Sequence, residues 1–329
     1  MTKEETGEAS TVHLSIKAGR RVFPTQLMLF FIVVIIVIVF SIFAPYFFTV
    51  HNAMNIALQA TIVGLLALGQ TFVLISGGID LSSVANLALS GVIGASVMKA
   101  YGIFPAIIVM LVISTAVGVL NAVSVVKMRM VPFMVTLAVM TMCTGLALLY
   151  TKAVTIGGLP ETFKALTTTK LWIFPVPVII VTIIYIIAHI YLSRGTFGRR
   201  LFSVGLGIRA ARLAGIPTSK VVMSVYILSG FLAGVASILL VSKLGSAGAG
   251  MVREDLILDN ISSAVMGGAS IYGGRGSAWG TIIGVFFIVI IGNALNLLGV
   301  TSFTILIVKG LIILFAIFAD TMRVRFLER

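Results

Sequence analysis

Charged residues are scarce in this sequence. Lys and Arg together number 23 and Asp and Glu only 10 among 329 residues, so charged residues make up 10% of the chain. A soluble domain typically carries about 25% charged residues. Apolar residues make up 59% of the chain, too many for a soluble protein to cover its surface with polar groups. The composition therefore excludes a soluble domain and predicts an integral membrane protein.

Two further absences limit the chemistry of the chain. Cys143 is the only cysteine, which excludes an internal disulfide, and we expect it to be a small core residue. The phosphate-binding loop Gly-x-x-x-x-Gly-Lys-Ser/Thr is also missing, because segment 273–277 (Gly-Gly-Arg-Gly-Ser) lacks both its spacing and its lysine. We therefore expect a protein that is not an enzyme, with no ATP site, catalytic residue, metal site or cofactor on this chain.

Long stretches without Lys, Arg, Asp or Glu predict the membrane-spanning helices, because about 20 apolar helical residues cross the core of a bilayer. The stretch 22–79 is long enough for two helices and is interrupted at Pro45, and the stretch 276–308 is interrupted at Gly299. The predicted fold is an all-α integral membrane protein with about ten transmembrane helices, of which the eighth is short and contains Asp259. These helices cover residues 27–44, 53–75, 83–99, 103–126, 131–150, 173–192, 221–241, 256–270, 278–298 and 302–319.

The basic residues predict the orientation, because cytoplasmic loops of membrane proteins are rich in Lys and Arg. With both termini inside, 16 basic residues fall in inner segments and six in outer segments, while Lys309 lies within a helix. The chain is then a single transmembrane domain, 1–329, with a cytoplasmic N-terminal segment (1–26), a cytoplasmic loop (193–220) and a cytoplasmic tail (320–329). Anionic lipid and a protein partner account for the net charge of +13, so this charge does not indicate nucleic-acid binding.

Predicted helices two to five and seven to ten form two blocks of similar length, 53–150 and 221–319. The first block would begin outside and the second inside, so the two would be related by inversion. Each contains glycines that interrupt a membrane segment: Gly77 and Gly78 in the first block, and the glycines of 267–276 in the second. Inverted repeats with broken helices are common in transporters, whose substrate site lies between the repeats. This organisation favours a transporter.

Polar and glycine residues in or near the predicted membrane segments are candidates for a solute path or gate. A charge in the bilayer core costs at least about 2.5 kcal/mol, so it needs a partner, water or a route to the interface. Uncharged amides could bind a hydroxyl-rich neutral solute without trapping it electrostatically. The alternative role is structural: an ion pair, an interhelical hydrogen bond or, for Asp80, acceptance of N–H bonds at the start of the third helix. The candidates are Gly77, Gly78, Asp80, Asn86, Asp259, Asn293 and Lys309.

The loop 193–220 carries six basic residues and no acidic residue. Residues 208–214 have the pattern of a short amphipathic helix, which Gly215 and Pro217 would end. This helix could lie on the lipid surface, or it could dock a soluble protein through small residues that permit a close approach. The candidate docking residues are Arg199, Arg200, Arg209, Ala210, Ala211 and Gly215.

Several separated motifs occur in the order found in one family of transporters. They are Ala-Pro-Tyr-Phe-Phe-Thr (44–49), Gly-Ile-Asp-Leu-Ser (78–82), Thr-Phe-Gly-Arg (196–199), the segment 210–216, Leu-Asp (258–259), Gly-Gly-Ala-Ser followed by Gly-Gly (267–274) and Asn-Leu-Leu-Gly-Val (296–300). From about Ser41 to Ala319 the chain resembles the permease subunits of ribose-type sugar ABC importers. Several separated motifs in the correct order identify a family much more specifically than any single motif does.

The resemblance implies a multi-pass protein of the bacterial inner membrane that translocates a pentose, a hexose or a related furanose. It also implies partners beside the lipid bilayer: an ATPase subunit that binds ATP and magnesium, a second permease subunit (a copy or a paralogue) and a periplasmic substrate-binding protein. The loop 193–220 would seat on the ATPase.

The sequence departs from the family pattern at a few positions, which leaves the solute open. Arg209 stands where many members have Glu, Ser83-Val84 replaces the usual Val-Gly, and Ile257 stands where an acidic residue is common. Neighbouring branches of the family carry nucleosides, so an ABC permease for a nucleoside-like solute is one alternative. An ion-coupled secondary transporter is the other.

Overall fold

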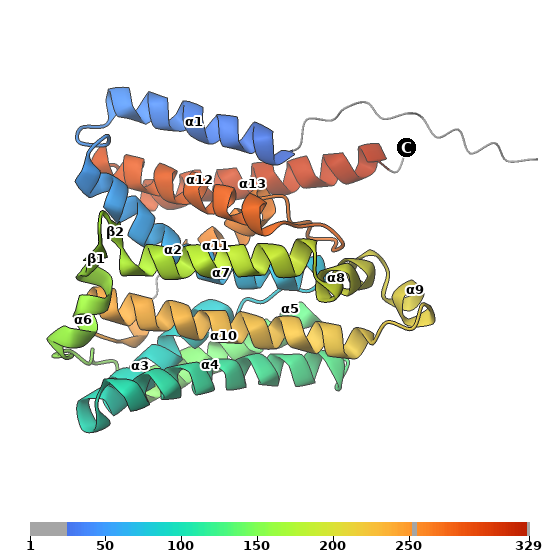
Figure 1. Ribbon diagram of the computed structural model, residues 1–329, viewed down its shortest axis with the longest axis horizontal. Helices are drawn as coiled ribbons and strands as arrows, with labels where there is room; N and C mark the ends of the chain where they lie inside the picture. Colours follow the sequence, from blue (N-terminus) through green and yellow to red (C-terminus); the bar gives the residue numbers. More distant parts are fainter. Residues whose placement is uncertain (1–24, 252–254, 328–329) are drawn as a thin grey trace, which may run out of the picture.

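The computed structural model describes residues 25–251 and 255–327, and this part of the chain is almost entirely helical (Figure 1). The strands β1 (Lys170–Leu171) and β2 (Phe174–Pro175) pair as a short antiparallel hairpin. The helices are α1 (Thr25–Phe43), α2 (Val50–Ile75), α3 (Ser83–Tyr101), α4 (Ile103–Val126), α5 (Pro132–Thr151), α6 (Glu161–Thr168), α7 (Val176–Ser193), α8 (Thr196–Leu206), α9 (Ile208–Leu213), α10 (Thr218–Leu244), the 3-10 turn η1 (Ala249–Met251), α11 (Asp255–Met266), α12 (Ala278–Leu297) and α13 (Ser302–Leu327).

The predicted all-α membrane fold is confirmed. Every predicted helix has a counterpart, namely α1 to α5, α7 and α10 to α13. Within the described residues, α1 to α5, α7, α10 and α12 are long and apolar enough to cross a membrane. Side chains on the outside of the bundle, such as Ile35, Ile42, Ile187 and Phe315, are large and apolar, as lipid contact requires.

Two predicted helix ends are wrong, for identifiable reasons. The eighth helix, expected over 256–270, is α11 and ends at Met266, because Gly267 and Gly268 follow and Gly268 has a φ of +94°. With 12 residues at 1.5 Å each, α11 is about 18 Å long, too short for a bilayer core of about 30 Å. The tenth helix, expected to end at 319, continues to Leu327, because a charged residue ends an apolar run without ending a helix.

Residues 1–24 of the predicted N-terminal segment and residues 328–329 of the predicted tail lie outside the described residues.

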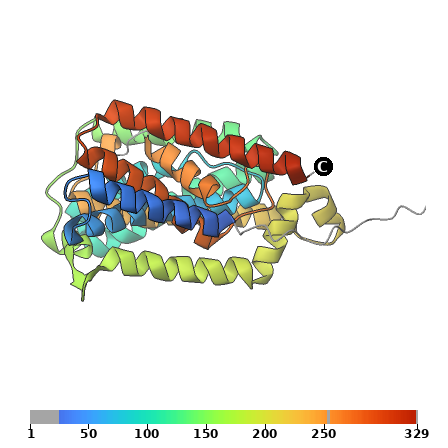
Figure 2. The same ribbon diagram turned by 90° about the horizontal axis from the view of Figure 1, so that it is seen from above.

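The long helices run side by side with the short α11 among them, and the other short elements gather at the two ends of the bundle (Figures 1 and 2). One end, called here the hairpin end, holds α6 and the β1–β2 hairpin; the other, called the α9 end, holds α8 and α9 (Figure 1). The start of α1 and the C-terminal end of α13 both lie at the α9 end (Figure 1). The described chain therefore begins and ends at the same end of the bundle (Figure 1).

Helices α2 and α10 form the centre of the bundle, and α10 packs against α2, α3 and α4. A methyl group at Gly118 of α4 would lie 2.7 Å from the carbonyl oxygen of Tyr226 on α10, and one at Gly230 of α10 would lie 2.6 Å from that of Ser114. Small residues at this crossing let the two backbones approach closely, which is how membrane helices gain packing contacts. The first helices of the two predicted blocks, α2 and α10, run in opposite directions (Figure 1), as inversion requires.

Candidate solute path and coupling surface

Asp80 lies buried in the connection between α2 and α3, where it joins several elements. Its Oδ1 accepts hydrogen bonds from the backbone N–H of Ser82 (2.9 Å) and the Ser82 hydroxyl (2.6 Å). Its Oδ2 accepts one from the Ser229 hydroxyl on α10 (2.7 Å). Asn121 on α4 donates to the Ser82 oxygen (2.7 Å). Asp80 therefore holds the connection at the start of α3 against α10 and, through Ser82, against α4, which favours its structural alternative.

The two glycines before Asp80 make this connection possible. Gly77 follows the end of α2 with a φ of +83°, a conformation that residues with a side chain rarely adopt. A methyl group at Gly78 would overlap the hydroxyl of Tyr226 and lie 3.2 Å from Val73. Gly77 and Gly78 thus turn the chain and bring its backbone against α10.

The candidate amides Asn86 and Asn293 form interhelical hydrogen bonds. Asn86 on α3 donates to the carbonyl oxygen of Ser114 on α4 (2.9 Å). Asn293 on α12 exchanges hydrogen bonds with Asn52 on α2, at 2.9 and 3.0 Å between nitrogen and oxygen. All three asparagines are buried, so these contacts match the structural alternative for both candidates.

Asp259 and Lys309 come together in an ion-pair cluster that joins α11 to α13. The Lys309 ammonium lies 2.8 Å from a carboxylate oxygen of Asp259 and 3.1 Å from one of Asp255. Asp255 was not among the sequence candidates, although it lies four residues before Asp259 and hence on the same helix face. Lys309 and Asp259 are largely buried, so each charge has the partner that a membrane protein requires.

This cluster lines a cavity of about 220 Å³, called here the Lys309 cavity. Its walls include the ends of three helices at the hairpin end: Lys243 is in the last turn of α10, Asp255 begins α11 and Asn296 is in the last turn of α12. Its lining residues are Gln59, Ile62, Val63, Leu240, Lys243, Met251, Asp255, Leu256, Asp259, Ile288, Val289, Gly292, Asn296, Ile305 and Lys309. Of the sequence candidates for a solute path, Asp259 and Lys309 line this cavity, whereas Asp80, Asn86 and Asn293 do not.

At the α9 end, the loop 193–220 folds into α8 and α9, followed by the start of α10. The amphipathic helix predicted over 208–214 is α9, Ile208–Leu213. Helix α8 was missed, although Phe197, Leu201 and Val204 recur at helical spacing; Leu201 and Val204 are buried.

The candidate docking residues divide by exposure. Arg199, Arg200, Arg209, Ala210 and Gly215 are exposed. Ala211 is buried and belongs to the core that includes α10, so the expected contact of Ala211 with a partner is corrected to a contact within the chain.

Apolar side chains that sequence reasoning did not single out are exposed beside these residues. The exposed fractions of the Leu206, Ile208 and Leu213 side chains are 74%, 49% and 90%. Helices α8 and α9 therefore present apolar and basic side chains on the same surface, called here the coupling surface.

A glycine junction joins α8 to the bundle. A methyl group at Gly205 of α8 would overlap the carbonyl oxygen of Ile75, the last residue of α2. Gly274 donates its N–H to that same oxygen (2.9 Å), and a methyl group at Gly273 would lie 3.1 Å from the Cα of Gly77. The end of α2, helix α8 and the segment 267–277 thus meet with backbone against backbone.

Sequence comparison identifies the class of protein that carries these features. Residues 52–317 match the family described as branched-chain amino acid transport system / permease component. The chain belongs to this family, and it is a multi-pass membrane permease.

Individual relatives are similar over almost the whole chain. It is 39% identical to the ribose import permease protein RbsC of Bacillus subtilis (strain 168), over 86% of this chain and 88% of that one. It is 33% identical to the D-allose transport system permease protein AlsC of Escherichia coli (strain K12), over 88% and 90% of the two chains. It is 31% identical to the L-arabinose transport system permease protein AraH of the same strain, over 85% of each. No solved structure matches the chain.

The hydrogen bonds of Asp80 predict that the shape of this side chain matters more for folding and transport than its charge does. Asp80→Asn keeps an oxygen for Ser82 and offers an N–H to the Ser229 hydroxyl, so the variant should fold and keep partial transport. Asp80→Leu leaves three buried donors unpaired, at about 1–3 kcal/mol each, and should reduce folded yield. Size-exclusion chromatography and uptake assays of both variants measure this. Equal inactivity of the two variants at normal yield would instead indicate that the Asp80 charge takes part in transport.

The glycine junction predicts that one methyl group at Gly205 is harmful. Gly205→Ala must push α8 away from Ile75, and such overpacking costs about 1–3 kcal/mol. Gly207→Ala is the matched control, because its methyl group would meet only Ala210 Cβ at 3.8 Å and its φ of 177° suits any residue. A thiol-reactive dye can follow thermal unfolding through the buried Cys143. A melting temperature lowered equally by both substitutions would contradict the close contact.

Proposed function

We propose that this chain is the membrane-spanning permease subunit of an ABC importer that carries a sugar across the bacterial inner membrane. In this proposal it pairs with a second permease subunit. A periplasmic binding protein delivers the sugar at the hairpin end, and an ATPase subunit that holds ATP and magnesium docks at the α9 end. The ribose, D-allose and L-arabinose permeases to which the chain is similar support a monosaccharide as solute.

The distribution of basic residues supports the orientation. The segments at the α9 end carry most of the Lys and Arg of the described chain, and cytoplasmic segments are enriched in these residues. They include Lys127, Arg129, Arg194, Arg199, Arg200, Arg209, Arg212, Lys220 and Arg275. The α9 end then faces the cytoplasm, where ATP is available.

The observation that carries the proposal is the connection of the coupling surface to the interior through the glycine junction. Leu213 and Ile208 expose apolar area beside Arg209, and an exposed apolar patch among basic residues suits a protein partner. Gly205, on α8, approaches Ile75 and Gly274 backbone to backbone. A displacement of α8 by the ATPase would therefore reach both the end of α2 and the segment 267–277.

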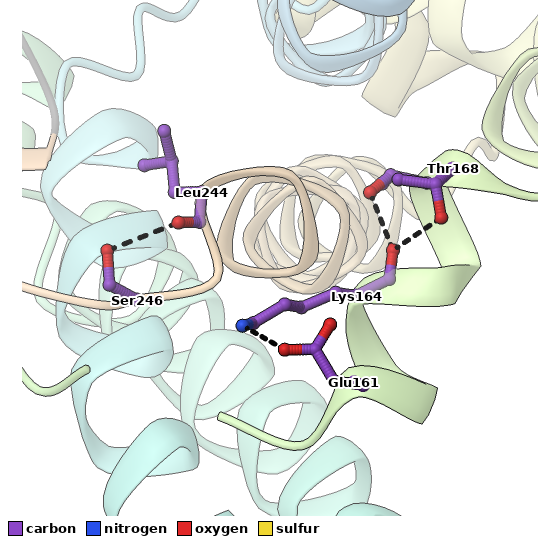
Figure 3. A network of polar contacts seen from close by, with 6 residues as sticks. Glu161, Lys164, Thr168, Leu244 and Ser246 are labelled. Atoms are coloured by element: carbon purple, nitrogen blue, oxygen red, sulfur yellow. Dashed lines mark hydrogen bonds and ion pairs between the residues drawn. The ribbon is translucent and has the colours of Figure 1, made fainter. Parts of the chain in front are cut away.

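The hairpin end offers a firm surface to the binding protein. Helix α6 lies against the end of α10, where the Ser242 hydroxyl donates to the Phe163 carbonyl oxygen of α6 (2.7 Å). Within α6, Lys164 pairs with Glu161 (2.7 Å; Figure 3). In the neighbouring hairpin, Trp172 is 95% exposed. Exposed aromatic side chains on a fixed support are frequent anchors in protein interfaces.

The Lys309 contacts favour this proposal over an ion-coupled transporter. A coupling cation would need the carboxylates of Asp255 and Asp259, and the ammonium of Lys309 already lies within 3.1 Å of both. Among the described residues, no group of three or more His, Cys, Asp or Glu could hold a metal ion.

The energy source tests the proposal. The permease, its ATPase and its binding protein are reconstituted in liposomes, and uptake of labelled D-ribose, D-allose and L-arabinose is measured. Uptake of at least one sugar should require ATP and stop with vanadate, while a protonophore or sodium ionophore should leave it unchanged. Uptake that proceeds without ATP and collapses with the ion gradient would refute the importer.

The coupling surface predicts that Leu213 is an anchor for the ATPase. Leu213→Glu places a charge where an apolar side chain would enter the partner, so co-purification of the ATPase should fall by at least about tenfold, a loss of about 1.4 kcal/mol. Leu171→Glu, at an exposed leucine of β1 at the opposite end, is the control and should retain the ATPase. Equal recovery of the ATPase with both variants would show that α9 is not the docking element.

A further inference from the structure

The charges of the described residues that line the Lys309 cavity balance. Asp255 and Asp259 contribute two carboxylates, and Lys243 and Lys309 contribute two ammonium groups. The described lining thus has no net charge, and it gives neither an anion nor a cation an overall electrostatic advantage. Such a cavity suits a neutral polar molecule.

The hydrogen-bonding groups of the cavity match a molecule with many hydroxyls. An ammonium has three N–H donors, and the contacts of Lys309 with Asp255 and Asp259 take up two of them. Gln59 and Asn296 are exposed, and their amides can both donate and accept, as sugar hydroxyls do.

The remaining lining is aliphatic, with Ile62, Val63 and Ile288 among its residues. These side chains offer apolar contact to the C–H groups of a sugar ring. A cavity with apolar walls and a few convergent polar groups is the usual form of a small-molecule site.

A purely structural role explains the ion pairs less well. A buried ion pair often stabilises a protein no better than packed apolar side chains would. Here the charged groups border about 220 Å³ of space, far more than the room that one water molecule needs. Ionisable residues in membrane segments commonly mark the path of a solute.

We propose that the Lys309 cavity is a subsite for a neutral, hydroxyl-rich solute inside each permease subunit. The inference rests on the proposed function, because sugar import supplies the solute class. A sugar released at the hairpin end would exchange hydrogen bonds with water for hydrogen bonds with Lys309 and with the amides of Gln59 and Asn296.

Gly292 allows the subsite to be closed without touching a charge. It lies on α12, lines the cavity, and a methyl group there would be 3.7 Å from Lys309 Cε. The side chain introduced by Gly292→Leu should fill the cavity and leave the ion pairs in place. Gly310→Leu is the matched control, since Gly310 neighbours Lys309 in α13 but faces open space.

The experiment measures equilibrium binding of labelled D-ribose, D-allose and L-arabinose to the purified complex of permease and ATPase in nanodiscs, without the binding protein. Wild type and Gly310→Leu should bind at least one sugar saturably, and D-ribose 5-phosphate should compete poorly. Gly292→Leu should bind at least about tenfold more weakly, as expected for the loss of hydrogen bonds to charged groups, and should lower the maximal uptake rate of the full importer.

The outcomes separate this inference from the proposed function. Unchanged sugar binding and uptake in Gly292→Leu, or ATP-driven uptake by a wild type that shows no binding, would overturn the subsite and leave the importer intact. Absence of ATP-driven sugar uptake by the wild type would overturn both. If Gly292→Leu lowers the melting temperature, the subsite is tested instead with Gln59→Leu and Asn296→Leu, which replace exposed amides of the cavity lining. Sugar binding to these two variants is then measured in the same way, and unchanged binding would overturn the subsite.

Discussion

The structure depends on one constraint: in a membrane, every buried polar group of a non-helical segment must find its partner within the protein. The connection between α2 and α3 leaves the helical hydrogen-bond pattern after Ile75, and the Asp80 carboxylate supplies the acceptor oxygens that this break requires. Its contacts with Ser82 and Ser229 fix the start of α3 against α10. Because α10 also packs on α2 and α4, this one buried carboxylate helps to position α2, α3 and α4 relative to α10.

The same constraint explains the contrast between the Asp80 contacts and the Lys309 cavity. Asp80 is surrounded by short hydroxyl and backbone donors and borders none of the described cavities. Lys309 instead satisfies two carboxylates from another helix and still borders open space. Charges in both places have partners, but only at Lys309 are the partners arranged around room for a further molecule. Burial alone therefore does not separate the two sites, whereas the cavity beside Lys309 does.

The sequence predicted those features that depend on composition and failed where three-dimensional proximity decides. Charge-free stretches located all the long helices, because the bilayer imposes their length and composition. The end of α13 was misplaced, since Asp320 interrupts an apolar run but not a helix. Ala211 was assigned to a partner because a small residue can face either way, and the fold places it in a core that α8 and α10 also form. Lys309 and Asp259 are 50 residues apart, so no local pattern could pair them.

The glycine junction connects α8 to the end of α2 and to the segment 267–277. Ile75 ends α2, and the segment with Gly77 and Asp80 follows it directly, so any shift at this residue acts on the connection that positions α3. Gly274 bonds to the same carbonyl and belongs to the segment that follows α11, the helix carrying Asp259. The contact of Gly205 with Ile75 and Gly274 allows no intervening side chain to absorb a movement. In the proposed importer, a movement of α8 would therefore reach both segments, one leading to the Asp80 contacts and the other to α11, which lines the Lys309 cavity.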